Sequence, residues 1–379
     1  MYLVANGSSV VFNVKLKSTL AAFLALALLS PITAIANDSS KVDAPPPAPG
    51  APPNRSASEL TPSASLSPGS KQPPVKHPRL VLALSGGACK AAAEIGVLRS
   101  LEKHHIVVDE IVATSMGSTI GALYCAGVSV DDIEKIFVDG TLHSALFKGV
   151  ALDMLTSPLS SFVDIFAGRP YYGLTAGRGY VKLLNTKLPP TFADLKIPFA
   201  AVVTNLTDGQ TMAITSGDLP QAVLASNSVP TLFRPVKIGE KLYVDGGLKA
   251  NLPATIAQGL GAEMVVAVLV DTAIKPVSNK IFRSKSALQK RVIDVMLASS
   301  DKAQTKSSDV LIYPNVDFVP SLTKDPAVIR KAIDEGERAA DSVALKIQGD
   351  LVAINENRNL PGDADVTTAT RGPVTPLIR

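Results

Sequence analysis

The sequence predicts an α/β sandwich, with a mainly parallel central sheet and helices on both faces. Short, continuous apolar runs bounded by turn residues indicate buried strands, because a strand covered on both faces has no polar side. These runs alternate with segments of helical period, which is typical of parallel strands joined by helical crossovers. Hydrophobic residues make up 46% of the 379 residues, enough for one large domain with a substantial core.

Four β-branched apolar runs predict the strands of the parallel part of the sheet. They span residues 79–85, 110–115, 197–205 and 263–271. Alanine-rich or amphipathic segments follow them and predict helices. These span residues 91–104, 116–127 and 253–261, with a last helix at 327–345. Two further elements complete the expected sheet: an antiparallel hairpin over 236–247, turning at Gly239–Glu240, and a short strand within 309–316.

Residues 1–36 have the pattern of a signal peptide. Lys15 and Lys17 precede the apolar run 19–30, and "AIA" at 34–36 has the small-x-small form of a cleavage site. The run is short for a membrane span, so we expect cleavage and export to the periplasm or beyond, with a retained anchor as the alternative. No cysteine follows the run, which speaks against a lipoprotein.

Residues 37–78 predict a proline-rich linker without a core, since eleven of the 41 residues from 38 to 78 are proline. A tether is the expected role, and a binding role is the alternative. The folded domain is expected over 79–349, with a variable insertion or lid at 137–190. A flexible polar tail is expected over 350–379.

The charge and the cysteine and histidine content exclude several classes of function. The formal charge of +4 falls to +2 without residues 1–36, which gives no electrostatic case for a nucleic-acid partner. Two cysteines and four scattered histidines offer no metal-binding spacing, so neither a metal nor an organic cofactor is expected. Cys89 and Cys125 are expected to be free thiols.

The stretch "LALSGGACKAAAEIGVLRSL" (82–101) predicts a strand, a tight glycine turn and a helix. Such a turn points backbone N–H groups and a helix N-terminus at one spot, which suits an anion. A nucleotide phosphate is the weaker interpretation, because the spaced glycines of a dinucleotide site are missing. Lys90 is also followed by Ala91, not by the Ser or Thr of a P-loop. An oxyanion formed in acyl transfer is the stronger interpretation.

The stretch "DEIVATSMGSTIGAL" predicts a nucleophile elbow at Ser115, where a strand ends and a helix begins at once. The small residues Ala113 and Gly117 would let neighbouring backbone approach closely. The alternative is that Ser115 only caps the following helix.

An elbow serine needs a base, and none of the four histidines lies at the end of a predicted strand. Asp245, in "LYVDGGLKANLP" (242–253), does end a strand. The two glycines after it would let the backbone turn and bring the carboxylate close to another segment. A carboxylate hydrogen-bonded to a serine can remove its proton if the site raises its proton affinity. The alternative is an ordinary Asp-Gly turn.

Taken together and in order, these motifs resemble the patatin-like phospholipase family, and the chain resembles a bacterial, exported member. "SGGACKAAAEIGVL" resembles the family's oxyanion loop and "ATSMGSTIGAL" its nucleophile block. "ASNSVPTLFRPVKIGEKLYVDGGLKANLP" (225–253) resembles the block that ends in the catalytic Asp-Gly, and the resemblance covers most of 79–345.

The resemblance implies a patatin-like fold and a serine acyl hydrolase with a Ser-Asp catalytic dyad and no cofactor. The implied site consists of catalytic Ser115 and Asp245, an oxyanion hole at Gly86, Gly87 and Ala88, and supporting Lys90, Gly117, Gly246 and Gly247. Three positions depart from the usual pattern, which has glycine at 88 and 91 and more often arginine at 90. Ala88 fits only if that position does not need a positive φ.

The implied substrates are lipid acyl esters, as for a phospholipase A or lysophospholipase. Two alternatives stay open: a general carboxylesterase or thioesterase, and a catalytically weak lipid-binding envelope protein. Apolar residues of the insertion could form a wall over acyl chains and contact a membrane surface, or could be ordinary core of a helical insertion. These are Leu146, Phe147, Leu155, Phe162, Ile165, Phe166, Tyr171 and Tyr172.

Overall fold

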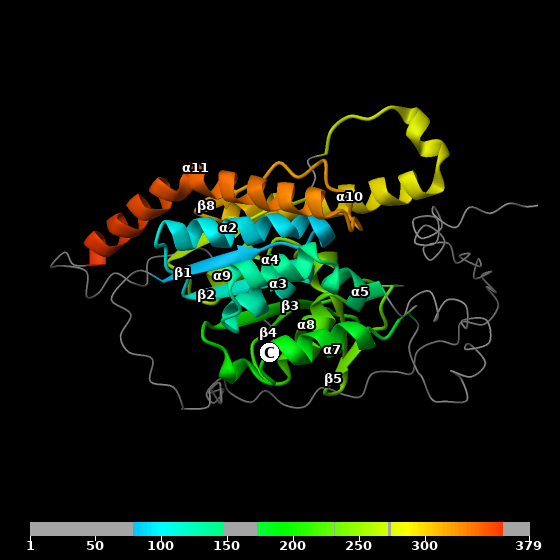
Figure 1. Ribbon diagram of the computed structural model, residues 1–379, viewed down its shortest axis with the longest axis horizontal. Helices are drawn as coiled ribbons and strands as arrows, with labels where there is room; N and C mark the ends of the chain where they lie inside the picture. The colour runs from blue at the N-terminus through cyan, green and yellow to red at the C-terminus, as the bar shows by residue number, and fades with distance from the viewer. Residues whose placement is uncertain (1–78, 148–172, 174, 231, 272–273, 359–379) are drawn as a thin grey trace, which may run out of the picture.

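A computed structural model describes residues 79–147, 173, 175–230, 232–271 and 274–358 (Figure 1). Their strands form one mixed sheet. Five strands run parallel: β1 (Leu80–Leu84), β2 (Glu110–Thr114), β3 (Phe199–Asn205), β7 (Met264–Val268) and β8 (Val310–Ile312). β4 (Thr211–Ile214) and β6 (Lys241–Asp245) run antiparallel to β3, and β5 (Val236–Ile238) pairs antiparallel with β6. The order is β5-β6-β3-β2-β1-β7-β8, with β4 paired to β3.

The predicted fold class, a mainly parallel sheet with helices on both faces, is confirmed. Each predicted strand of the parallel region is present, and the predicted hairpin is the β5–β6 pair. The strand expected within 309–316 is only three residues long. β4 was not predicted, because its four residues are all half-buried and give no alternation to detect.

The predicted helices are also present, although their ends differ. They are α2 (Ala92–Lys103), preceded by the 3-10 turn η1 (Ala88–Ala91), then α3 (Ser115–Cys125), α9 (Ala254–Gly259) and α11 (Pro326–Arg358). The described residues contain five further helices that were not predicted: α4 (Val130–Val138), α5 (Thr141–Phe147), α7 (Arg178–Lys187), α8 (Leu219–Ser226) and α10 (Lys285–Gln304).

The C-terminal helix corrects one predicted boundary. α11 runs through residue 349 to Arg358, so 350–358 are helical and do not belong to an irregular tail. The reason is that apolar residues continue at helical spacing beyond 345. Ile347 is fully buried, and Leu351 and Ile354 pack against the core.

The core lies on both faces of the sheet, and the alternation along β1 shows this division. Leu80, Leu82 and Leu84 belong to a large cluster that includes residues of α2, α3, α4 and α11. Val81 and Ala83, pointing the other way, belong to a smaller cluster with α9. Both sets are fully buried, which explains why the strand reads as one continuous apolar run.

The helices α2 and α11 lie side by side (Figure 1), and two glycines permit this close approach. A Cβ on Gly96 would overlap the main-chain oxygen of Ile333, and one on Gly336 would overlap that of Ala93.

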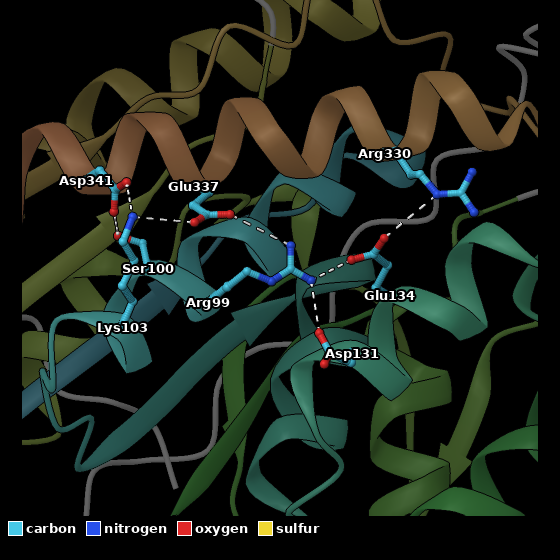
Figure 2. Close-up of polar contacts among 8 residues, drawn as sticks. All are labelled: Arg99, Ser100, Lys103, Asp131, Glu134, Arg330, Glu337 and Asp341. Atoms are coloured by element: carbon cyan, nitrogen blue, oxygen red, sulfur yellow. Dashed lines mark hydrogen bonds and ion pairs between the residues drawn. The ribbon is translucent and has the colours of Figure 1, made fainter.

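Ion pairs line the edge of the same contact (Figure 2). Arg99 of α2 bonds Glu134 of α4 at 2.5 Å and lies 3.9 Å from Glu337 of α11, and Lys103 bonds Asp341 at 2.8 Å. Because these groups are partly exposed, close packing contributes more to stability than the ion pairs do.

Several predictions fall on residues outside the described ranges. The signal peptide at 1–36, the linker at 37–78, the part of the insertion from 148 to 172 and the tail from 359 lie there. So do six residues of the expected apolar wall: Leu155, Phe162, Ile165, Phe166, Tyr171 and Tyr172. Within the described residues, no helix combines the length and apolar character that a membrane span needs.

Candidate active site

The centre of the candidate site lies where two strands meet head-on beside β3. β4 pairs with Ala201–Thr204 along one edge of β3, so β2 and β6 must share the other edge. β2 ends with Thr114 opposite Val202, and β6 arrives from the opposite direction and ends with Asp245 opposite Val203. The residues that follow these strand ends are therefore brought together by the pairing register itself.

Ser115 occupies the sharp turn between β2 and α3. Its φ is 52°, a left-handed value that a non-glycine residue adopts only at some cost. Its N–H donates to Ser226 Oγ at 2.9 Å, and Ser226 Oγ donates in turn to Val202 O at 2.7 Å. A Cβ on Gly117 would come within 2.5 Å of Ser85 O, so only glycine fits there. Ser115 thus has the backbone conformation of a nucleophile elbow.

Asp245 bonds Ser115 directly. Ser115 Oγ donates to Asp245 Oδ2 at 2.7 Å, and the N–H of Gly247 donates to Oδ1 at 2.7 Å. Burial raises the pKa of Asp245 to about 6, against the opposing effect of these two hydrogen bonds. A carboxylate with this proton affinity can accept a proton from a serine near neutral pH.

The glycines after Asp245 are needed for space and not for backbone conformation. Neither Gly246 nor Gly247 has a positive φ. A Cβ on Gly246 would overlap Val202 O, and one on Gly247 would lie 3.1 Å from Asp245 Oδ1. These glycines therefore do let the carboxylate lie close to another segment, as the sequence suggested. The physical reason is that a side chain at either position would collide with its neighbours.

The loop after β1 lies against the elbow. A Cβ on Gly86 would come within 2.9 Å of Ser115 Cβ. However, the N–H of Gly86 already donates to Asn251 O at 3.1 Å, so this amide is not available to an oxyanion. Among the described residues, no protein acceptor takes the N–H of Gly87 or Ala88. Gly87 and Ala88, at the N-terminus of η1, are therefore the two predicted donors whose N–H groups lack a protein acceptor in this part of the chain, and their role at an oxyanion stays a prediction.

Alanine was expected to fit at position 88 only if the backbone there did not need a positive φ, and this condition is not met. The φ of Ala88 is 51°, where L-residues other than glycine are disfavoured by roughly 1–2 kcal/mol. Gly87, at φ 172°, is in extended backbone, and its side-chain position is filled by Val270. The side chain of Lys90 is buried below the loop.

Sequence reasoning did not assign the residues that hold the elbow in place. Asn227 Nδ2 donates to Ser118 Oγ at 3.0 Å, and Ser118 Oγ donates to Ser115 O at 2.6 Å. The main-chain oxygen of Ser228 accepts the N–H of Asp245 at 3.0 Å. Ser226, Asn227 and Ser228 form the run "SNS" at the C-terminal end of α8. Three adjacent small polar residues beside a buried helix were the available signal.

Other reactive groups do not compete with Ser115. Burial raises the pKa of Cys89 to about 11 and that of Cys125 well above its usual value, and the two thiols are not bonded to each other. In the described part of the chain, no three His, Cys, Asp or Glu side chains are grouped so that they could hold a metal ion.

The sheet and the elbow define a mixed α/β protein in which a strained serine at a strand end bonds an aspartate from an antiparallel strand. Comparison with known families makes this assignment specific. Residues 82–258 match the family model described as patatin-like phospholipase, and the mixed α/β sheet with its surrounding helices agrees with the patatin fold.

Several named relatives are similar over about half of the chain. It is 32% identical over 193 residues to patatin-like phospholipase domain-containing protein 7 of Rattus norvegicus, covering 50% of this chain and 13% of that protein. It is 29% identical over 191 residues to an uncharacterized NTE family protein of Mycobacterium tuberculosis, covering 50% and 49%. Lysophospholipase NTE1 of Debaryomyces hansenii is 29% identical over 187 residues, covering 49% and 11%.

Among solved structures, VipD from Legionella pneumophila aligns over 72% of this chain and 67% of its own, with 16% identity and a TM-score of 0.42. The chain spans about half or less of the length of the curated relatives named above. The activities in the names of these relatives are therefore stated of the relatives only, and the activity of this chain is a proposal.

Proposed function

We propose that this chain is a serine acyl hydrolase that cleaves the acyl ester bonds of lipids, with Ser115 as nucleophile and Asp245 as general base. The observation that carries the proposal is the 2.7 Å hydrogen bond from Ser115 Oγ to a buried carboxylate whose pKa is about 6. The phospholipase and lysophospholipase names among the relatives support a lipid substrate.

The proposed reaction has two halves. Asp245 takes the hydroxyl proton while Ser115 Oγ attacks the ester carbonyl carbon, and the carbonyl oxygen becomes an oxyanion near the N–H groups of Gly87 and Ala88. The intermediate collapses, the acyl–oxygen bond breaks, and the alcohol leaves with the proton held by Asp245. Asp245 then takes a proton from water, whose oxygen attacks the acyl-serine carbonyl carbon. When this second intermediate collapses, the bond from the acyl carbon to Ser115 Oγ breaks, Ser115 Oγ takes the proton back from Asp245, and the fatty acid is released.

Two alternative functions are also compatible with this site. A carboxylesterase or thioesterase acting on soluble esters would use the same dyad, and its activity would not rise when the substrate forms micelles. A catalytically weak lipid-binding protein is favoured by one observation, the left-handed φ of Ala88 in the donor loop. The unstrained alternative at that position would be glycine.

The test is labelling with a fluorophosphonate probe together with hydrolysis of short-chain, long-chain and micellar esters. We expect the wild-type chain to be labelled and to hydrolyse long-chain esters best. Ser115→Ala and Asp245→Asn should each lower turnover by a factor on the order of 10⁴ while the protein stays folded by circular dichroism. Retained hydrolysis in either variant would exclude the dyad, and an unlabelled, folded wild type would favour the lipid-binding alternative.

We also propose that residues 1–36 direct export and are removed. The apolar run and the "AIA" site support this. Amino-terminal sequencing of the protein from a periplasmic or extracellular fraction should begin at Asn37. A chain recovered with its first residues intact in the membrane fraction would support the retained anchor instead.

A further inference from the structure

The positive charge of the chain is concentrated in one segment. Residues 274–296, here called the arm, contain six lysines and arginines and one aspartate, a formal charge of +5. The whole chain has a formal charge of +4, so all the other residues together carry −1. A positive charge that is confined to one segment indicates that this segment contacts a negatively charged partner. It does not indicate a charge that serves only the solubility of the protein.

The arm also exposes an apolar stripe on α10. Leu288, Val292, Val295 and Met296 are 46%, 50%, 46% and 60% exposed. At 100° per residue, these four positions fall within about 100° of one another around the helix. A helix of a monomeric domain normally turns such a stripe inward, so this one has its apolar side on the outside.

The apolar surface continues at both ends of the helix. At the N-terminal end, Ile281 in the 3-10 turn η4 (Asn279–Arg283) is exposed, as are Ile274 and Val277 before it. At the C-terminal end, Ser300 Oγ donates to Lys249 O at 2.8 Å, and Lys249 follows the exposed Leu248. Leu248 lies three residues after Asp245, so the surface reaches the turn that carries this carboxylate.

Beyond its first residues, where Lys275 Nζ donates to Asp317 Oδ2 at 2.8 Å, the arm stands away from the rest of the fold. Figure 1 shows α10 and the segment before it, in yellow, extending beyond the end of the sheet. Lys280 and Arg283 are exposed there, next to Ile281. Basic and apolar side chains are thus presented together, on a part of the molecule that can reach a flat surface without obstruction by the sheet.

We propose that the arm docks on the surface of an anionic lipid bilayer. The apolar stripe of α10 would enter the interface, and Lys280 and Arg283 would meet the lipid phosphates. The proposed contact is peripheral, because the side chains of the arm would reach only the interface of the bilayer. Leu248 would lie at the same surface, close to the Ser115–Asp245 pair.

The arm fits this partner better than two others. A nucleic acid would use the basic residues but leave the stripe of Leu288, Val292 and Met296 exposed. A second copy of the chain could cover the stripe, but pairing two arms would bring together two segments of charge +5. Only a surface that is both anionic and apolar below its charges satisfies both features.

The test places an environment-sensitive dye on the arm, which separates its contribution from that of other apolar segments. The full chain carries Ser115→Ala, so that no lipid is consumed, and Val292→Cys labelled with nitrobenzoxadiazole. The matched control carries Leu345→Cys on α11, a position that is 80% exposed. A chain without the added cysteine measures labelling of Cys89 and Cys125. Vesicles are either phosphatidylcholine alone or equimolar phosphatidylcholine and phosphatidylglycerol.

We expect a blue shift and a rise in emission at position 292 with the anionic vesicles, and none at position 345. The apparent affinity should fall with added salt and by about fivefold for each charge removed in Lys280→Gln and Arg283→Gln, which corresponds to roughly 1 kcal/mol per charge. The same substitutions at Lys182 and Lys187 of α7 should leave it unchanged.

Three results would overturn the proposal. These are no spectral change at 292, an equal change with phosphatidylcholine alone, and an affinity that Lys280→Gln and Arg283→Gln do not alter. A change at 292 that depends on protein concentration and not on vesicles would assign the stripe to self-association. Hydrolysis of a soluble ester by the chain with Ser115 intact tests the proposed function separately, because it needs no membrane.

Discussion

The main-chain oxygen of Asn251 accepts the N–H of Gly86 at 3.1 Å, which ties the loop beside Ser115 to the segment after Asp245. This segment is held in turn by Asp301 of α10. Asp301 Oδ2 accepts from Asn251 Nδ2 at 3.1 Å, and Oδ1 accepts from the N–H of Leu252 at 3.0 Å. One buried carboxyl group therefore fixes the position of the loop after β1 relative to Asp245.

The first prediction concerns this positioning residue. Asp301→Ala removes two hydrogen bonds and leaves two buried donors without partners, which costs about 2–4 kcal/mol of unfolding free energy. We expect a lower Tm and a lower kcat, with KM for a short ester little changed. Ser300→Ala, its neighbour on α10, removes one exposed hydrogen bond and serves as the control. Equal kcat in the two variants would show that Asp301 does not position the loop.

The second prediction contrasts the two alanines at positions where the family pattern has glycine. Ala88 has a φ of 51°, so Ala88→Gly should relieve strain and raise the unfolding free energy by roughly 0.5–1 kcal/mol. Ala91 has a φ of −59° and is fully buried, so Ala91→Gly should lower it by at least about 1 kcal/mol. Urea denaturation measures both. Two changes of the same sign would contradict the backbone assignment.

The candidate site shows which structural features could be predicted from the sequence and which could not. The elbow at Ser115 and the Asp-Gly turn at 245 were predictable, because a strand must end where an apolar run meets small turn residues. The register that sets Thr114 and Asp245 opposite neighbouring residues of β3 was not predictable, because pairing between distant segments leaves no local pattern. The φ of Ala88 likewise depends on how the loop after β1 meets the elbow.

The contacts of Asp301 and Gly86 with Asn251 could not be predicted from the sequence for a similar reason. Asp301 looks like any acidic residue of an amphipathic helix, and its burial against Asn251 arises only from the way α10 crosses the segment after Asp245. The hydrogen bond from the Gly86 N–H to Asn251 is another long-range contact, so nothing in the sequence indicated that this amide is already occupied. Local patterns therefore predicted the elbow and the turn after β6, and long-range packing set the contacts that the residues there make.

The third prediction tests the close packing of α2 on α11. Gly96→Ala would place a methyl group on the main-chain oxygen of Ile333, so the helices must separate. We expect a loss of about 3 kcal/mol or more of unfolding free energy. Gly349→Ala, in α11 with no atom within 4 Å of the new Cβ, should instead stabilise by about 0.5–1 kcal/mol. A thermal melt of each variant decides, and a neutral Gly96→Ala would refute the close contact.

The fourth prediction concerns Glu94, a fully buried carboxyl group below the elbow. A Cβ on Gly117 would lie 3.1 Å from its Oε2. Burial raises the pKa of Glu94 well above its usual value, against a smaller opposing effect of the Ser85 backbone. Because the folded-state pKa is raised, stability is greatest at low pH and is lost as the pH rises above the ordinary value of 4.5.

Glu94→Gln keeps the shape of the neutral acid and removes this loss. The variant should therefore have the higher Tm at pH 7.5, and the difference should shrink as the pH approaches 4.5. Glu94→Ala, which leaves a cavity, should have a lower Tm than Glu94→Gln at every pH. A Glu94→Gln variant that is less stable than the wild type at pH 7.5 would mean that the carboxylate is ionised and needed.

The last prediction uses Asp245, whose burial affects activity and stability in opposite ways. Its pKa is raised from 3.8 to about 6, so the carboxylate that we propose as the base is populated only above about pH 6. The kcat/KM for a soluble ester should rise with pH through this value and then level off. The same shift means that stability is lost between about pH 4 and pH 6, by at most about 3 kcal/mol.

Asp245→Asn should therefore abolish turnover and yet raise the Tm at pH 7.5, with no gain near pH 4. A structural aspartate would behave differently, because its replacement would lower the Tm at neutral pH. A pH–rate profile of the wild type and paired melts of the two proteins distinguish these cases. If the profile is flat from pH 5 to pH 8, Asp245 is not the base, and the proton on Ser115 must leave by another route.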